Sequence, residues 1–243
     1  MNKLPTVDIS FWVMLITATT LGETAGDLLS MTMNFGYATS SIILVTLFLL
    51  ALVFELIVKT RHDALYWTVI VLTSTAGTTL SDYIDRSLGL GYALGTTILM
   101  GLLAAVFTLW KISAHSFSIS KINSLKTEAL YWTAILLSST LGTALGDFLS
   151  DDSGLGFGGS TLTLACILLI ILALTIFTKT SRVLLFWLAI IIIHPIGATL
   201  GDYFTKPEGL HFGPSSATAM LLILFSLVAT LTRIIKKPAL TND

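Results

Sequence analysis

Five acidic residues stand within or at the end of long apolar stretches, where a carboxylate is costly unless it binds something. They are Glu23, Asp27, Asp82, Asp147 and Asp202. Insertion scales put an ionised carboxylate at the bilayer centre at about 2.5–3.5 kcal/mol, so a group of them needs compensation. Carboxylate oxygens bind protons and hard cations such as Mg²⁺, Mn²⁺ or Ca²⁺. These residue types therefore indicate cation chemistry.

The four aspartates occupy equivalent positions of an internal repeat. Each copy has an aromatic residue followed by Trp, then Gly ten residues after the Trp and Asp fifteen residues after it. The tryptophans are Trp12, Trp67, Trp132 and Trp187, and the glycines are Gly22, Gly77, Gly142 and Gly197. Nine residues past each Asp a second landmark follows, at Gly36-Tyr37, Gly91-Tyr92, Gly156-Phe157 and His211-Phe212. Such self-similarity predicts four copies of one two-helix unit.

A ring of carboxylates is the arrangement that this repeat favours. Small residues one turn before each Asp let helices approach closely, so four equivalent helices would bring the four aspartates together as a cation or metal site. A secondary ring of hydroxyls is predicted at Ser41, Thr96, Thr161 and Ser216. Only Arg86 and Lys206 are basic on that side of the predicted membrane, which is too few to pair with every acid and leaves a bound cation or protons to compensate them.

Two further residues break the repeat. Glu23 lies one turn before Asp27 and shares its helical face, whereas the other copies have Thr or Ala at that position. An acid inside a span is a functional candidate, and we assign Glu23 to the pathway. His194 stands where the other copies have Thr or Ser, and it is a candidate proton relay. A purely structural hydrogen bond from His194 is the equal alternative.

Composition places the whole chain in a membrane. Of 243 residues, 54% are hydrophobic and only 11% are charged, with a mean hydropathy of +0.89. These values exclude an ordinary soluble domain. The near-neutral net charge of −1 gives no reason to expect nucleic acid as a partner. The expected partners are the lipid bilayer and a small cation, and the oligomeric state is left open, a homo-oligomer included.

The predicted fold is an all-α integral membrane protein with eight transmembrane helices. Each apolar stretch approaches the ~20 residues that cross a bilayer as a helix. The chain forms one membrane domain, 1–243, of four parallel two-helix repeats with pseudo-fourfold or 2+2 pseudo-twofold symmetry. The repeats cover approximately 8–60, 63–112, 128–180 and 183–236, and a cytoplasmic linker covers 113–127. The tryptophans are expected to be anchors at the inner membrane interface.

Orientation follows from the positive-inside rule. All but two of the 13 Lys and Arg residues fall on one side of the predicted spans, which places both termini in the cytoplasm. The exceptions are Arg86 and Lys206, so the repeat aspartates lie toward the outer face. No GxxxxGK[ST] motif is present to indicate ATP-driven pumping by this chain.

The YW/FW pairs, the GD motifs and the Gly-Leu-Gly-aromatic loops together resemble a family of bacterial membrane proteins of unestablished function, built from four tandem two-helix repeats. The resemblance covers nearly the whole chain. It implies an eight-helix fold and a bacterial inner, or plasma, membrane. The fourth repeat departs from the pattern at His194-Pro195 and at His211.

Three functions remain open from the sequence. We favour a transporter or channel for small cations, with hard divalent ions preferred and proton coupling as an option. The site would be the aspartate ring, and no cofactor is expected. An intramembrane enzyme using Glu23 and His194 is the second, although no catalytic motif is present and four near-equivalent acids do not resemble one active site. The third is a structural or assembly protein, in which the aspartates only cap turns.

Overall fold

The computed structural model describes residues 5–58, 60, 62–114, 116–118, 122 and 124–236, and the regular structure within these ranges is helical. The α-helices are α1 (Ile9–Asp27), α2 (Gly36–Ile57), α3 (Asp63–Asp82), α4 (Gly91–Ala114), α5 (Leu125–Asp147), α6 (Gly156–Phe177), α7 (Arg182–Thr205) and α8 (Gly213–Lys236). Five of the basic residues on which the predicted orientation rests lie outside the described residues: Lys3, Lys59, Arg61, Lys121 and Lys237.

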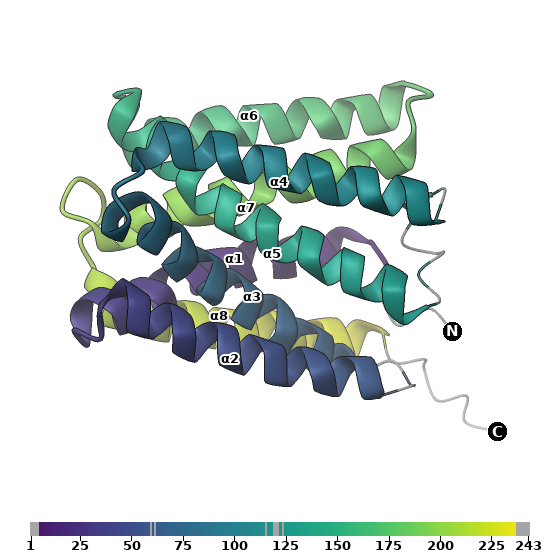
Figure 1. Ribbon diagram of the computed structural model, residues 1–243, viewed down its shortest axis with the longest axis horizontal. Coiled ribbons are helices and arrows are strands. Elements are labelled where there is room, and N and C mark those ends of the chain that lie inside the picture. Colours follow the sequence, from purple (N-terminus) through teal and green to yellow (C-terminus); the bar gives the residue numbers. More distant parts are fainter. Residues whose placement is uncertain are drawn as a thin grey trace.

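The odd-numbered helices form a closed inner ring. Figure 1 shows the inner helices α3 and α5 between the outer helices α2 and α4. In this ring α1 packs against α3, α3 against α5, α5 against α7, and α7 against α1. Each even-numbered helix lies outside the ring and packs on the inner helix of the next repeat, α2 on α3, α4 on α5, α6 on α7 and α8 on α1. Because each outer helix packs on the next repeat, the four repeats interlock. A ring of four like helices is the arrangement that the tandem repeat predicts.

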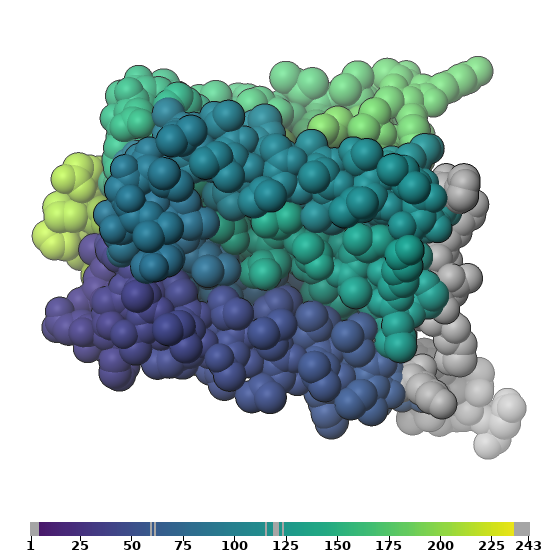
Figure 2. Space-filling model, viewed as in Figure 1, coloured from purple at the N-terminus to yellow at the C-terminus, as the bar shows by residue number. Residues whose placement is uncertain are grey.

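Six of the helices are long and apolar enough to cross a membrane. They are α2, α4, α6, α7, α8 and α5 with the turn after it. Helices α1 and α3 are not among them, because many of their residues are Thr, Ser and Gly. Those polar residues are mostly buried inside the protein, while the outer helices expose large apolar side chains. Figure 2 shows α2 and α4 covering one face, with part of α5 visible between them.

Aromatic residues at the start of the inner helices join successive repeats. The residue before each Trp packs its ring on the Trp of the next copy, with centroids 5.5–5.9 Å apart. The pairs are Phe11–Trp67, Tyr66–Trp132, Tyr131–Trp187 and Phe186–Trp12. The expectation that the tryptophans are anchors at the inner membrane interface does not fit Trp67, Trp132 and Trp187, because these ring contacts bury them in protein.

Close backbone contacts hold the middle of the ring. A Cβ atom added to Gly22, Gly77, Gly142 or Gly197 would lie 2.8–2.9 Å from a backbone atom of the next inner helix. Real Cβ atoms essentially never come so close. The residues they face are Ser74, Ser139, His194 and Thr19, so the contact repeats around the whole ring. The small residues therefore have the role that the sequence predicts for them, the close approach of neighbouring helices.

The loops after the inner helices differ in the fourth repeat. The first three inner helices continue into five-residue π-helical turns, η1 (Leu28–Thr32), η2 (Tyr83–Ser87) and η4 (Phe148–Asp152). The outer helices then begin at a glycine with φ of 65–74°, a region open to glycine: Gly36, Gly91, Gly156 and Gly213. The predicted equivalence of His211 with these glycines is therefore wrong, because the last loop is two residues longer and His211 precedes its glycine.

Candidate cation site

The four repeat aspartates lie at the last residue, or close to the last, of the four inner helices, and all are at most 3% exposed. Because these helices form a ring, their ends bring the carboxylates to one end of the bundle. The positions are Asp27, Asp82, Asp147 and Asp202. The gathering of the acids is a direct consequence of the repeat and the closed ring.

Arg86 bridges two of these aspartates. Its Nε lies 3.0 Å from Asp82 Oδ1, and Nη2 donates to Asp147 Oδ2 at 3.0 Å. Nη1 also donates to the Tyr37 hydroxyl at 3.2 Å, and the guanidinium lies over the rings of Tyr37 and Tyr92 at 5.8 and 5.6 Å. A planar guanidinium suits such a set of contacts. Arg86 is thus fixed from several sides between the second and third repeats.

Lys206 bridges the other two. Its Nζ lies 3.0 Å from Asp27 Oδ2 and 3.3 Å from Asp202 Oδ1. Burial lowers the pKa of Lys206, but the nearby carboxylates of Asp202 and Asp27 outweigh it and raise the pKa above its usual value. The ammonium is therefore charged at neutral pH, and it joins the fourth repeat to the first.

These bridges correct the expectation that the basic residues are too few. Each base lies four residues after an Asp of its own repeat and reaches the Asp of the next repeat as well. Two bases therefore contact all four aspartates. The first and third repeats have Met31 and Asp151 at the same position, so the bridges follow twofold rather than fourfold symmetry.

Glu23 lies one turn deeper, and the residues at the same position in the second and third repeats hold its carboxylate. Its Oε2 accepts hydrogen bonds from Thr78 Oγ1 at 3.0 Å and Thr143 Oγ1 at 2.9 Å. The Thr143 hydroxyl also lies 3.4 Å from that of Thr78, so equivalent side chains of three repeats meet. The glutamate is 4% exposed, and no ion pair among the described residues includes it.

The space for Glu23 comes from the fourth repeat. A Cβ atom on Gly201 would lie 2.8 Å from Glu23 Cβ and 2.9 Å from its Cγ. The residue at the Glu23 position in that repeat is Ala198, whose small side chain leaves room inside the ring. The glutamate therefore fits because two small residues of one repeat face the large acid of another.

Three carboxylates are close enough to share a metal ion. Glu23, Asp27 and Asp202 each offer an oxygen within 4.8 Å of the others, and all three are buried. Oxygen-only ligands of this kind suit hard cations such as Mg²⁺, Mn²⁺ and Ca²⁺. Lys206 already contacts Asp27 and Asp202, so a metal ion that binds both carboxylates must displace the ammonium.

The structure does not place the proton-relay candidate in this cluster. His194 is 3% exposed, its Nδ1 lies 2.8 Å from the carbonyl oxygen of Ile190, and its Nε2 has no hydrogen-bond partner among the described residues. It stands two turns before Asp202 on α7, about 12 Å along the helix axis. Helix α7 continues through Pro195.

The predicted hydroxyl ring is also separate from the acids. Its members lie on the outer helices, and no hydrogen bond of the described residues joins them to a repeat aspartate. Thr161 Oγ1 lies 2.8 Å from both the carbonyl oxygen of Phe157 and the Thr199 hydroxyl. The buried hydroxyls of Ser41 and Thr96 lack a partner within the described chain. The fourth member is Thr218 rather than the exposed Ser216, because the longer loop shifts the register by two residues.

Sequence reasoning missed the partners of the acids. In the sequence, Thr78 and Thr143 only show that Glu23 is unusual at its repeat position. They are not predicted as its hydrogen-bond donors, although equivalent positions of neighbouring inner helices face each other in a ring. Arg86 and Lys206 lie four residues after Asp82 and Asp202, a spacing at which opposite charges meet on a helix. This i,i+4 spacing is the sequence signal that predicts the ion pair of each base with the Asp of its own repeat.

A model for a repeat of unknown function, DUF347, matches residues 10–61, 65–116, 130–181 and 185–237. The four matches cover most of the chain, which therefore belongs to this family. No curated protein and no solved structure matches the chain.

Proposed function

We propose that this multi-pass member of the DUF347 repeat family carries or conducts a small cation, and that the cation binds Glu23, Asp27 and Asp202. The observation that supports this most is Glu23, a buried carboxylate held by two hydroxyls inside the ring without a basic partner among the described residues. A buried carboxylate needs a proton or a cation to offset the lost hydration.

In this proposal all eight helices cross the membrane. Helices α1 and α3 are too polar to qualify by composition, but the repeat makes them equivalent to α5 and α7, which do qualify. The outer helices shield their hydroxyls from lipid. The excess of Lys and Arg at the other end places the termini in the cytoplasm of a bacterial cell and the aspartates toward the outer face of its inner membrane.

The two bridges have different roles in the proposal. Arg86 contacts two carboxylates, one hydroxyl and two aromatic rings, so it is a fixed structural clamp. Within the described part of the chain, Lys206 pairs with two carboxylates alone, through a flexible side chain. The mobile half of the cluster is therefore the half that holds the three candidate ligands.

Lys206 acts in this scheme as a tethered cation. When Glu23, Asp27 and Asp202 are all ionised, the single positive charge of Lys206 offsets only one of their three negative charges, whereas a divalent ion in its place offsets two. The incoming ion takes the place of Nζ between Asp27 and Asp202, and Lys206 moves toward the outer loop. A proton on Glu23 is the alternative occupant, which would couple proton and cation movement. His194, about 12 Å from Asp202 along the axis of α7, is the candidate relay.

Flux measurements in proteoliposomes test this proposal. The native chain is compared with Glu23→Gln for Mg²⁺, Mn²⁺, Ca²⁺ and proton movement. Asp151→Asn is the matched control, because Asp151 is an exposed acid just beyond the ring. We expect a flux that Glu23→Gln abolishes and Asp151→Asn preserves. Lys206→Gln should raise the apparent cation affinity at least tenfold, which corresponds to about 1.4 kcal/mol, because the competing ammonium is gone.

Two results would refute the proposal. One is the absence of any cation or proton flux in the native protein, and the other is full flux in a folded Glu23→Gln variant. Thermal unfolding of each variant separates loss of folding from loss of function.

A further inference from the structure

An apolar groove lies between the outer helix α6 and the inner helices α7 and α1. It has a volume of about 490 Å³, and its walls are almost entirely aliphatic and aromatic side chains. Trp12 and Ile16 line it from α1, Leu168 and Leu172 from α6, and Ala189 from α7. Among the described ion pairs none includes Arg182, which lies at one end of the groove.

The equivalent groove beside α4 is filled by the chain itself. There the side chain of Phe117, from the linker between the second and third repeats, packs on Phe107 and Trp110 with ring centroids 5.7 and 6.2 Å apart. Its backbone oxygen accepts a hydrogen bond from Trp187 Nε1 at 3.1 Å. An apolar ring and a carbonyl oxygen therefore occupy this groove together, and the oxygen is hydrogen-bonded to the indole N–H of Trp187.

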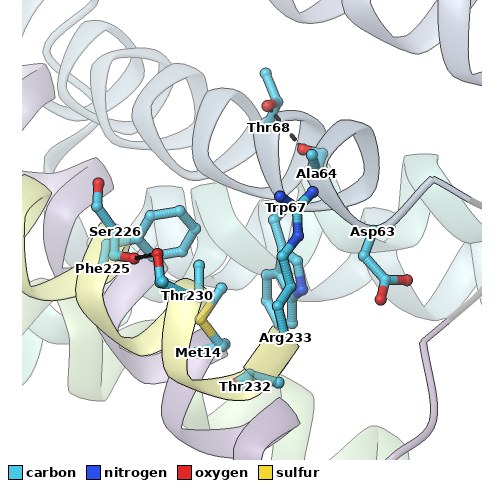
Figure 3. Close-up of a pocket in the computed structure, with 11 residues that line it drawn as sticks. Met14, Asp63, Ala64, Trp67, Thr68, Phe225, Ser226, Thr230, Thr232 and Arg233 are labelled. Atoms are coloured by element: carbon cyan, nitrogen blue, oxygen red, sulfur yellow. Dashed lines mark hydrogen bonds between the residues drawn. The ribbon is translucent and has the colours of Figure 1, made fainter. Parts of the chain in front are cut away.

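The groove beside α8 is smaller and more polar. Figure 3 shows Trp67 and Phe225 in its wall, with Thr230 and Arg233 nearby, and its volume is about 250 Å³. The Phe225 ring lies 6.4 Å from the Trp67 ring, so the outer helix itself covers this Trp. By contrast, the ring contacts of Trp12 come from Phe11 and Phe186 on the inner helices. The groove beside α6 thus leaves its Trp open to an outside group.

The depth of the open groove matches one half of a bilayer. Arg182 and Ile193 both line it and lie eleven residues apart on α7, which is about 16 Å at 1.5 Å per residue. The hydrocarbon core is ~30 Å thick, so the groove spans roughly one leaflet. Arg182 is the first residue of α7 and stands at one end of the groove. Basic side chains close to a membrane surface attract the phosphates of anionic lipids.

We propose that this groove binds one anionic phospholipid. An acyl chain lies along Ile16, Leu168 and Ala189, and the headgroup phosphate pairs with Arg182. Trp12 Nε1 donates to an ester carbonyl oxygen, as Trp187 Nε1 does to the carbonyl of Phe117. The lipid occupies between the third and first repeats the place that Phe117 fills between the second and fourth repeats. This site is independent of the proposed cation site.

Native mass spectrometry of the detergent-purified full chain tests the site, with phosphatidylglycerol and phosphatidylcholine of the same acyl chains as probes. We expect one phosphatidylglycerol to be retained with at least a tenfold preference over phosphatidylcholine. Arg182→Gln should remove that preference, while Arg182→Lys should keep most of it. Lys179→Gln is the matched control, because Lys179 is an exposed base on the same loop that does not line the groove.

Two more variants separate the acyl chain from the headgroup. Leu172→Trp fills the groove and should release both lipids at least tenfold more readily. Trp12→Phe keeps the ring but removes the donor, and it should weaken retention several-fold without changing the headgroup preference. Equal retention of the two lipids by the native chain, or an unchanged preference in folded Arg182→Gln, would overturn the proposal. Thermal unfolding in detergent confirms that each variant folds.

Discussion

Adding one methyl group to a glycine of the inner ring should destabilise the whole bundle. In Gly77→Ala the new Cβ atom would lie 2.5 Å from Ser139 Oγ and 2.9 Å from the backbone nitrogen of Thr140. The serine side chain has alternative rotamers, but the backbone of α5 cannot move without displacing that helix. Helices α3 and α5 must therefore separate, and their neighbours in the closed ring move with them.

The magnitude is the balance of two opposing effects. Overpacking a well-packed interior costs about 1–3 kcal/mol, and a clash with backbone belongs at the upper end of that range. Replacing Gly by Ala within a helix gains about 1 kcal/mol from propensity. The net destabilisation of Gly77→Ala should therefore be about 2 kcal/mol.

The matched control is Gly101→Ala. Gly101 lies within α4 on an exposed face, and a Cβ atom there would have nothing within 4 Å. Only the propensity effect remains, so this variant should be slightly more stable than the native protein. The assay is the unfolding of purified protein in mixed micelles with increasing dodecyl sulfate, followed by tryptophan fluorescence.

Symmetry sharpens the test. Gly22→Ala, Gly142→Ala and Gly197→Ala meet backbone at 2.8–2.9 Å as well, so each should cost about as much as Gly77→Ala. If any of the four variants is as stable as Gly101→Ala, the corresponding contact is not made and the ring is open at that point. The reasoning about a closed ring would then be refuted.

Three further predictions concern the polar contacts. Arg86→Lys should cost about 1.5–3 kcal/mol of stability, because an ammonium cannot keep both carboxylates and the tyrosine contacts; a variant as stable as the native protein contradicts the clamp. The carboxylates of Asp202 and Asp27 raise the pKa of Lys206 in the folded protein. The bridge therefore stabilises the fold fully below the ordinary lysine pKa of about 10.4, and this stabilisation is lost only as pH rises through the higher pKa of the folded state. The stability difference between the native protein and Lys206→Met should thus stay constant from pH 7 to about pH 10 in melting experiments, and a decline near pH 8 would argue against the bridge. Tyr66→Phe should cost about 1–3 kcal/mol, because the buried Tyr131 hydroxyl, 2.8 Å from that of Tyr66, loses its partner, and the Tyr66→Phe/Tyr131→Phe double variant should cost less than the two single variants added together in the same unfolding assay.

Much of the fold can be predicted from the amino-acid sequence, because the four copies of the repeat can be recognised in it. Equal spacing of Trp, Gly and Asp in four copies indicates the helix pairs. Hydropathy sets α1 and α3 apart from the outer helices, but it does not set α7 apart, because α7 is as apolar as they are. The repeat also singles out Glu23, because only one copy has an acid at that position. Periodicity carries this information since equivalent positions in like helices face equivalent neighbours.

Which charges meet depends on the tertiary structure. Arg86 and Lys206 belong to their own repeats by the i,i+4 spacing, but each reaches a second aspartate only because the ring brings the next helix beside it. The same holds for Thr78 and Thr143, which donate to Glu23 across repeats. The sequence alone does not tell which helices are neighbours, because this follows only once the ring closes. Closure depends on close backbone contacts such as that of Gly77 with α5.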